Sequence, residues 1–457
     1  TPYEILLSES QERMLVVAIK GHEDAVRAIL EKWDLTAAVI GEVIAEPVYR
    51  VTEGARVVAE FPGTRLVTDC PFYTPDAVES PEIIALRARD VDAIAERPEE
   101  ADPAWTLLQL LASPTIANKE WVYRQYDSTV RTNTVIGPGG DAAVIRIRGT
   151  DRAIAVKTDG NGRYTYLDPR QGARIAVAEA ARNVACTGAR PMAITNNLNF
   201  GNPRKPDVYY QLREAVAGMG EACRALGTPV TGGNVSLYNE TPRGAIYPTP
   251  VAGMVGCIDH LAHITPSAFS HAGDQIVLLG EPTASIGASE YLQRIHGVVA
   301  GAPPACDLDA ERALIDTLLD AITAGAVRSA HDCADGGLAV ALAECAMMDR
   351  RLPFGARVDL SPWAGLPLRA LLFGEAQGRA IVSTPDAARV VEIAQRHGVP
   401  ARPIGVVHDG DRLDIVVGER DVSIPLAQLV DAYFESIPRI MSRPASAVAA
   451  SPVPTAV

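Results

Sequence analysis

Three clusters of glycine and amide residues in the middle of the chain have the composition of a phosphate- or nucleotide-binding site. They are GPGGD at 137–141, TNNLNFG at 195–201 and TGGNVSL at 231–237. Glycine lets the backbone approach a phosphate and point N–H groups at it, while asparagine and serine add neutral contacts to a magnesium–nucleotide or a sugar phosphate. One Gly-Gly-Asn sequence is more often a plain turn, and none of the three is a P-loop. Three such clusters in one segment nevertheless favour a ligand site.

A fourth polar stretch follows the apolar run at 153–156. Lys157 and Asp159 are followed by glycine and asparagine at 160–162, and Asp168 precedes Pro169. A lysine at a strand end, an acidic residue two positions later and a helix beginning at a proline would suit a phosphate with its metal. A solvated loop with Asp168 as a helix N-cap is an equally good interpretation.

Two further polar motifs lie outside this segment. Glu9, Ser10 and Gln11 precede an apolar run at 14–18, which predicts either a substrate clamp or a strand-entry turn. The sequence HDCADGG at 331–337 has residues for a metal site or a Cys/His dyad, but its Asp-Gly-Gly favours a strand-to-helix turn.

The chain also repeats itself. SESQER at 8–13 and GEAQGR at 374–379 are each followed by an apolar run expected as a strand (14–18 and 380–382), an amphipathic helix with apolar residues at i, i+3, i+4 and i+7, and an expected Ile-Gly-x-Val strand (40–43 and 404–407). A long globular stretch precedes the late copy, whereas the early copy has none. Residues 1–75 are therefore expected to form the back half of a domain whose front half is absent.

Composition excludes several classes of protein. The chain has 457 residues, a net charge of −14 and no basic stripe that could neutralise nucleic-acid phosphates. The seven cysteines are scattered without CxxC pairs, which argues against a disulfide framework or a zinc site. No apolar run reaches the ~20 residues of a membrane span. We expect a soluble cytoplasmic protein that binds neither nucleic acid nor membrane.

Four strings carry a specific resemblance to a known family. They are LSESQERM at 7–14, KEWVYRQYD at 119–127, TNNLNFGNP at 195–203 and TGGNVSLYNE at 231–240. All resemble the synthetase subunit of phosphoribosylformylglycinamidine synthases, and the resemblance covers nearly the whole chain except its tail. It implies an α+β fold of two tandem copies, each with an ATP-binding domain like that of aminoimidazole ribonucleotide synthetase and an α+β C-terminal domain.

By this resemblance the chain has five segments. These are part of a first C-terminal-type domain at 1–80, a linker at 81–104, a second ATP-binding domain at 105–262, a second C-terminal-type domain at 263–440 and a disordered tail at 441–457.

The reaction implied is a carbon–nitrogen ligation of purine biosynthesis. ATP phosphorylates the amide oxygen of formylglycinamide ribonucleotide, and ammonia displaces the phosphate to give the amidine. A separate glutaminase subunit would supply the ammonia, a small accessory subunit would bridge the two, and the missing N-terminal half of the same protein would complete the site.

The resemblance also implies roles for single residues. Glu9, Ser10, Gln11 and Ser236 would contact the substrate, Asn196 and Gly233 ATP, and Asn234 the Mg²⁺; Lys157 and Asp159 would belong to an auxiliary nucleotide site. Asn196 departs from the aspartate frequent at its position. The catalytic histidines of the family lie in the first copy, so we expect no catalytic residue here and an inactive isolated chain.

Two alternatives stay open. One is another enzyme of the aminoimidazole ribonucleotide synthetase superfamily, which would lack the SESQERM-type triplet in a preceding half-domain. The other is a non-catalytic scaffold whose bound nucleotide is structural. We also expect outer strands near residues 123–127 to pair with a partner domain, and the isolated chain to self-associate or be unstable.

Overall fold

The computed structural model describes residues 1–9 and 12–443. It divides into two compact units, Thr1–Thr74 and Pro75–Val457. Each unit is described by itself. Across the described ranges, no helix has both the length and the apolar character needed to cross a membrane.

Unit 1 is small and has no core. It contains helices α1 (Pro2–Leu7), α2 (Glu23–Glu31) and α3 (Thr64–Val67), and an antiparallel hairpin of β1 (Val48–Glu53) and β2 (Arg56–Pro62). None of its described residues is buried. Helix α2 confirms the amphipathic helix predicted in the early copy of the repeat.

The strands expected at 14–18 and 40–43 are not formed, which corrects that prediction. Met14 is 89% exposed and Ile40 is 82% exposed. In the late copy the counterparts are strands β14 (Ala380–Thr384) and β15 (Ala401–His408), which pair with their neighbours β12 (Ser329–Asp332), β11 (Gln275–Leu279) and β13 (Gly355–Asp359). No such neighbours flank the early copy within the described part of unit 1. A strand needs partners for its N–H and C=O groups, so apolar sequence alone does not form one.

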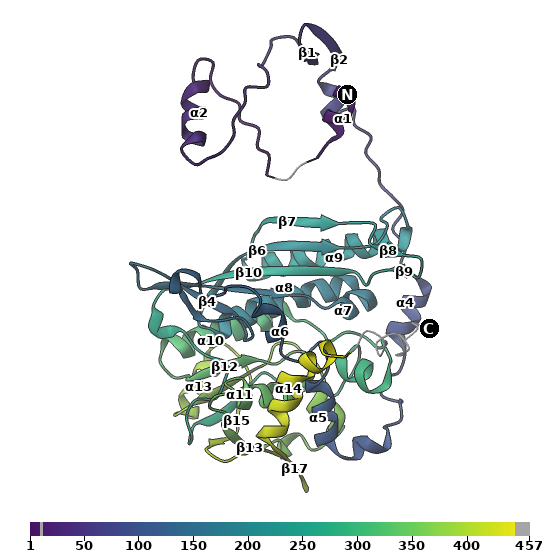
Figure 1. Ribbon diagram of the computed structural model, residues 1–457. Coiled ribbons are helices and arrows are strands. Elements are labelled where there is room, and N and C mark those ends of the chain that lie inside the picture. Colours follow the sequence, from purple (N-terminus) through teal and green to yellow (C-terminus); the bar gives the residue numbers. More distant parts are fainter. Residues whose placement is uncertain (10–11, 444–457) are drawn as a thin grey trace. The chain divides into compact units, whose positions relative to one another are not determined.

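Unit 2 begins with a six-stranded sheet of order β3-β4-β5-β10-β6-β7. The strands are β3 (Thr134–Ile136), β4 (Ala143–Ile147), β5 (Arg152–Asp159), β10 (Thr249–Ile258), β6 (Arg190–Asn199) and β7 (Val230–Ser236). Helices α7 (Gly162–Leu167), α8 (Pro169–Cys186) and α9 (Pro206–Leu226) lie on one side of it (Figure 1). The predicted stripe of α8, including Val177 and Val184, is fully buried against the sheet. The opposite face is open.

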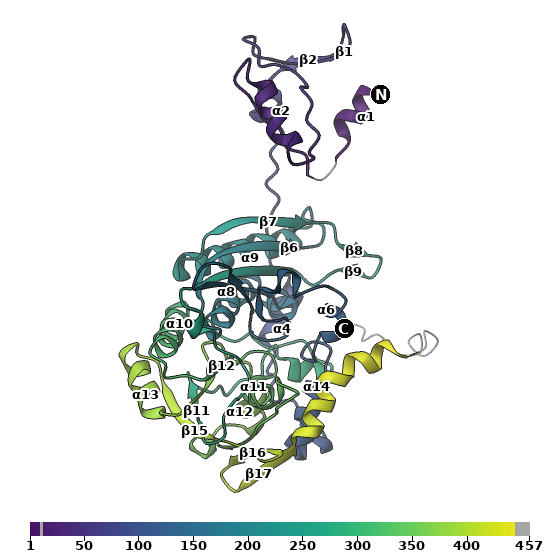
Figure 2. The same ribbon diagram turned by 60° about the vertical axis from the view of Figure 1, so that its left-hand side comes forward.

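A seven-stranded sheet of order β12-β14-β11-β15-β13-β16-β17 forms the other layer of unit 2. Its last strands are β16 (Arg412–Val417) and β17 (Arg420–Pro425), which lie at the far end of the unit from β7 in both views (Figures 1 and 2). Ile276 and Leu278 of β11 face α5 (Pro103–Leu111), α11 (Gly337–Met347) and α14 (Leu426–Met441). Val277 and Leu279 share a core with α8, α10 (Leu308–Thr323) and α13 (Ala387–Arg396). The two sheet domains are therefore joined by one continuous core.

Three segments differ from the expectations drawn from sequence. The stretch expected as a linker at 81–104 contains α4 (Pro81–Ala88) and buries Ile83 and Val91, because its acidic, proline-punctuated sequence still carries apolar residues that pack into unit 2. Residues 123–127 form no strand: α6 (Glu120–Tyr123) ends there in a turn, and the outer strand is β3. Most of the predicted tail, from 444 onward, lies outside the described residues.

Candidate functional site

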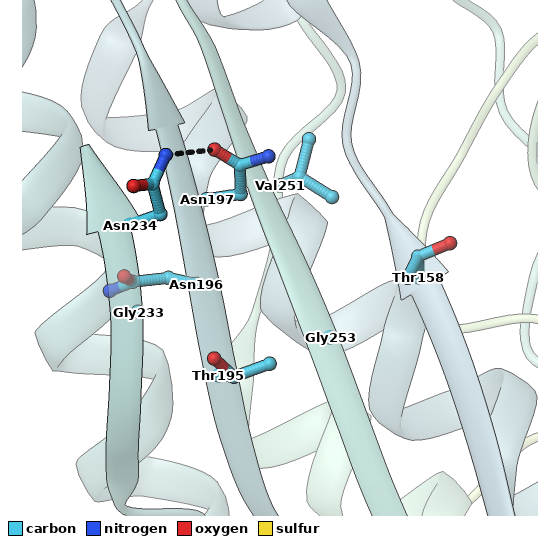
Figure 3. Close-up of a pocket in the computed structure, with 8 residues that line it drawn as sticks. All are labelled: Thr158, Thr195, Asn196, Asn197, Gly233, Asn234, Val251 and Gly253. Atoms are coloured by element: carbon cyan, nitrogen blue, oxygen red, sulfur yellow. Dashed lines mark hydrogen bonds between the residues drawn. The ribbon is translucent and has the colours of Figure 1, made fainter. Parts of the chain in front are cut away.

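Two of the predicted glycine and amide clusters come together on β6 and β7, where they line a hollow with β10 and β5. Figure 3 shows its lining: Thr158, Thr195, Asn196, Asn197, Gly233, Asn234, Val251 and Gly253. β6 and β7 are parallel, and Asn196 lies beside Gly233 and Asn197 beside Asn234. The polar residues that follow each apolar run therefore meet at the same edge of the sheet, as parallel pairing requires.

The glycines of this hollow cannot carry side chains. A Cβ on Gly233 would lie 1.9 Å from Oδ1 of Asn196, and a Cβ on Gly253 would lie 2.8 Å from Cγ2 of Thr195. Asn196 points to the helix side of the sheet, where its Nδ2 lies 3.8 Å from Sδ of Met219. Gly253 therefore keeps the hollow accessible to a ligand, whereas Gly233 makes room for Asn196 on the helix side of the sheet.

Asn234 has an amide oxygen free to accept a ligand. Its Nδ2 donates to Oδ1 of Asn197 at 3.4 Å and to Oγ of Ser236 at 3.3 Å. Across the described residues its Oδ1 accepts no hydrogen bond. No carboxylate lines the hollow, so a cation here would have only neutral oxygen ligands from the protein. Such a site fits Mg²⁺ that arrives with the phosphates of a nucleotide, which supply the missing negative charge.

A second polar site lies on the opposite, helix-covered side of the same sheet. Oδ2 of Asp159, at the end of β5, accepts from Nδ2 of Asn183 on α8 at 3.1 Å, and its Oδ1 accepts from the N–H of Gly160 at 3.0 Å. Nδ2 of Asn183 also lies 3.5 Å from Oδ2 of Asp332 on β12. Lys157 is on the same side, two residues before Asp159. β5, α8 and β12 thus bring together residues that are far apart in sequence.

This second site has more buried acid than base. Arg182 donates to both carboxylate oxygens of Glu311, at 2.7 and 2.9 Å, and to Oδ2 of Asp332 at 3.3 Å. Burial raises the pKa of Asp332 to about 7 despite Arg182. Burial and the neighbouring Asp159 raise the pKa of Glu179 well above its usual value. Burial opposes the charge of Lys157, yet Asp159 and Asp332 outweigh it and raise the pKa of that ammonium. Excess buried carboxylate is unfavourable without a cation.

The remaining predicted motifs have clear places. The carboxylate of Asp141, from the first glycine cluster, accepts from the N–H of Asp332 at 3.0 Å and contacts Nδ1 of His331 at 2.9 Å. Nε2 of His331 lies 3.1 Å from Oε2 of Glu344. The segment at 331–337 is the turn from β12 into α11, as the sequence favoured. Oxygen and nitrogen atoms of Asp141, His331 and Asp332 also lie within 4.8 Å of one another, a spacing at which a cation could be held.

The substrate triplet expected at the N-terminus lies in unit 1. Glu9 is exposed there, and Ser10 and Gln11 lie outside the described residues. Ser236 is at the end of β7. Sequence reasoning missed Thr158, Asn197, Glu179 and Asn183. Asn197 was within the predicted cluster, whereas Glu179 and Asn183, four residues apart on α8, are recognisable only once β5 is placed against that helix.

Comparison with known proteins defines the class of the chain. Residues 139–258 match the AIR synthase related protein N-terminal domain, and residues 1–54 and 271–418 match the C-terminal domain of the same proteins. The chain belongs to this family, with the α+β architecture predicted. The two separate matches to the C-terminal domain agree with the repeat found in the sequence.

Comparison with curated relatives narrows the similarity to one kind of protein within this class. The chain is 49% identical over 97% of its length to phosphoribosylformylglycinamidine synthase subunit PurL of Moorella thermoacetica, and 48% identical over 99% to that of Anaeromyxobacter sp. strain Fw109-5. This confirms the resemblance stated above. The chain spans about 60% of the length of each of these relatives.

Solved structures share the fold. T. maritima PurL complexed with FGAR superposes with a TM-score of 0.59 at 22% identity, over 72% of this chain and 54% of that one. PurLQS from Thermotoga maritima superposes with a TM-score of 0.52 at 23% identity, over 64% and 47%.

Proposed function

We propose that this chain is part of an ATP-dependent amidine-forming ligase that converts formylglycinamide ribonucleotide and ammonia to formylglycinamidine ribonucleotide. The observation that carries the proposal is the near 50% identity to PurL subunits over almost the whole chain, combined with a hollow built in part from two of the strings that carry the family resemblance. Solved PurL structures in complex with ATP and with FGAR support the two ligands.

In this function the open face of the six-stranded sheet binds ATP. Gly253 leaves room for the nucleotide beside β6, and the free Oδ1 of Asn234 is the ligand offered to Mg²⁺. Asn234 would help to hold Mg²⁺, which when bound would supply neutralisation of the charge on the transferred phosphate. Ser236 at the end of the same strand is a substrate contact in this function. Glu9, Ser10 and Gln11, in unit 1, are substrate contacts by the same family resemblance. The catalytic histidines would come from the N-terminal half of the protein, outside this sequence.

Turnover by the isolated chain tests the proposal. Formylglycinamide ribonucleotide, ATP, Mg²⁺ and ammonium chloride are supplied, and the amidine and ADP are measured. We expect nucleotide binding without turnover by this chain, and turnover once a PurL N-terminal half completes the site. A glutaminase subunit and a small accessory subunit would then replace ammonium chloride by glutamine, in line with the PurLQS neighbour. Absence of ATP binding to the chain, and of product with the completed protein, would reject the assignment.

The buried acidic site favours a second function, an auxiliary nucleotide site that serves structure. Lys157 would face a phosphate, and Asp159 with Asp332 would hold its Mg²⁺. We expect Mg²⁺ with ADP to raise the unfolding temperature by several degrees, and Asp159→Asn to abolish that increase. Asp151→Asn, at an exposed carboxylate paired with His260, is the control that leaves it unchanged. A stabilisation that survives Asp159→Asn would place the ligand elsewhere.

A further inference from the structure

The two copies of the repeat use the same three positions differently. Aligned on the repeat, Glu9, Ser10 and Gln11 correspond to Glu375, Ala376 and Gln377. The first three are the substrate triplet of the proposed function. The serine hydroxyl is replaced by a methyl group in the late copy. The two remaining polar side chains, Glu375 and Gln377, can therefore be examined in the folded unit 2.

Glu375 is fully used by internal contacts. It is 3% exposed. Its Oε1 accepts from the N–H of Glu290 at 2.8 Å and from the N–H of Gly336 at 2.7 Å. Its Oε2 accepts from the hydroxyl of Tyr164, which is 1% exposed. Three donors therefore saturate one carboxylate.

The backbone donors around Glu375 offset part of the unfavourable free energy of burying an ionised carboxylate. Gly336 is the N-cap of α11, a helix of 11 residues, and Glu290 precedes the π-helical turn Leu292–His296. Two helical N-termini thus direct N–H groups at the same carboxylate, an arrangement that stabilises negative charge.

Further contacts join the same two domains around this carboxylate. Tyr164 belongs to α7 of the nucleotide-binding domain, whereas Glu290, Gly336 and Glu375 belong to the C-terminal domain. Next to Tyr164, Arg163 pairs with Glu290 at 2.7 Å, with both side chains buried.

Gln377 also binds within unit 2: its Oε1 accepts a hydrogen bond from Arg182 of α8 at 3.1 Å. Asn161, ahead of α7, donates to Oδ1 of Asp335 at 3.1 Å. Glu375 and Gln377 therefore each make one side-chain hydrogen bond to the other domain of unit 2, to Tyr164 and to Arg182 respectively.

We infer that in the late copy the substrate triplet has become a latch between the two domains of unit 2, with Glu375 and Tyr164 at its centre, and that this latch excludes formylglycinamide ribonucleotide from the triplet positions 375–377. The substrate named here rests on the proposed function. The latch itself rests only on contacts within the chain. Glu375 and Tyr164 are positioning residues: they hold the domains together and fill the place of a ligand.

Amide hydrogen exchange at pH 8.5 tests the latch in the unliganded chain. Glu375→Gln keeps the shape but removes the charge, and Tyr164→Phe removes one donor. We expect the N–H groups of Glu290 and Gly336 to exchange at least about tenfold faster in Glu375→Gln, and by a smaller factor in Tyr164→Phe. Asp431→Asn, which breaks an exposed ion pair with Arg439, is the control that leaves both amides unchanged. Unchanged protection of these two N–H groups in Glu375→Gln would overturn the latch. If Glu375→Gln does not fold, unchanged protection in Tyr164→Phe would overturn it instead.

Calorimetric titration with formylglycinamide ribonucleotide tests the exclusion. We expect any binding by the chain to be equal in wild type and Tyr164→Phe, because the latched triplet positions 375–377 offer no group to the substrate. Saturable binding that is lost in Tyr164→Phe would overturn the exclusion. If the completed protein makes no amidine but the two amides still lose protection in Glu375→Gln, the proposed function fails and the latch stands.

Discussion

Glu12 and Gly378 have the same left-handed backbone conformation, with φ of 61° and 66° respectively. Each is followed by an arginine that reaches back to the carbonyl five residues earlier: Arg13 donates to Ser8 at 3.1 Å, and Arg379 donates to Gly374 at 2.8 Å. The two copies of the repeat therefore keep one turn, although unit 1 has no core around it. The turn is a local property of the sequence.

This turn predicts the cost of a side chain at Gly378. A Cβ there would meet only Oε1 of Glu311, at 3.9 Å, so Gly378→Ala should carry backbone strain without a clash. We expect a loss of about 1 kcal/mol in the free energy of unfolding, measured by urea denaturation. Gly365→Ala is the control, because Gly365 has ordinary φ and open space around it. Equal losses in both variants would contradict the turn.

Gly253 provides a test of the ATP hollow. A Cβ on Gly253 would lie in the hollow, 2.8 Å from Cγ2 of Thr195, whereas a Cβ on Gly365, which is not among the residues that line the hollow, meets nothing within 4 Å. We expect Gly253→Ala to weaken binding of a fluorescent ATP analogue about tenfold or more, equivalent to about 1.4 kcal/mol, and Gly365→Ala to change it little. The hollow would not be the nucleotide site if the two variants bound equally.

The stability of the chain should fall as pH rises from about 4.5 to 7. Burial raises the pKa of Glu375 to about 7 and that of Asp332 to about 7, above their values in the unfolded chain. In this range the folded state binds more protons than the unfolded state, so raising the pH costs up to about 1.4 kcal/mol per unit for each group. Glu375→Gln has no such group at that position. We therefore expect a smaller slope of unfolding free energy against pH in that variant. An identical slope would show that Glu375 does not contribute to the pH dependence of stability.

Strand β7 predicts self-association of the isolated chain. It is an edge strand, and six of its seven residues are exposed, among them Val230 at 46% and Val235 at 53%. Unpaired N–H and C=O groups beside exposed valines favour pairing with another copy. We expect concentration-dependent sedimentation at micromolar protein, and a shift toward monomer in Val235→Lys. A wild-type chain that stays monomeric would contradict this prediction.

An element could be predicted from sequence where the fold supplies neighbours that pack against it or hydrogen-bond to it. The helix stripe ending at Val184 and the strand at 380–384 were predictable because their apolar spacing is met by neighbours along and across unit 2. Met14 lies in an equally apolar run, yet it is exposed, because strand formation depends on hydrogen-bonding partners that a local pattern does not reveal.

The candidate sites show the same limit. Asn196 and Gly233 were identifiable because amide and glycine clusters follow two strands that turn out to be parallel neighbours. The acidic site was represented by Lys157 and Asp159, and by Asp332 within the motif at 331–337, which the sequence favoured as a turn. Its members outside β5 come from a helix and from a strand of the second sheet, and their proximity arises from tertiary packing rather than from spacing along the chain.

Strand β5 places three consecutive residues on two faces of one sheet. Thr158 lines the open hollow, whereas Lys157 and Asp159 face α8. The pleat of a strand fixes this alternation, and a shift by one residue would exchange the faces. An ATP molecule on one side and a metal-bound phosphate on the other would be separated by a wall one strand thick. If binding of one ligand shifts strand β5, it changes the affinity for the other ligand. Thermodynamic linkage then requires that the second ligand changes the affinity for the first by the same factor.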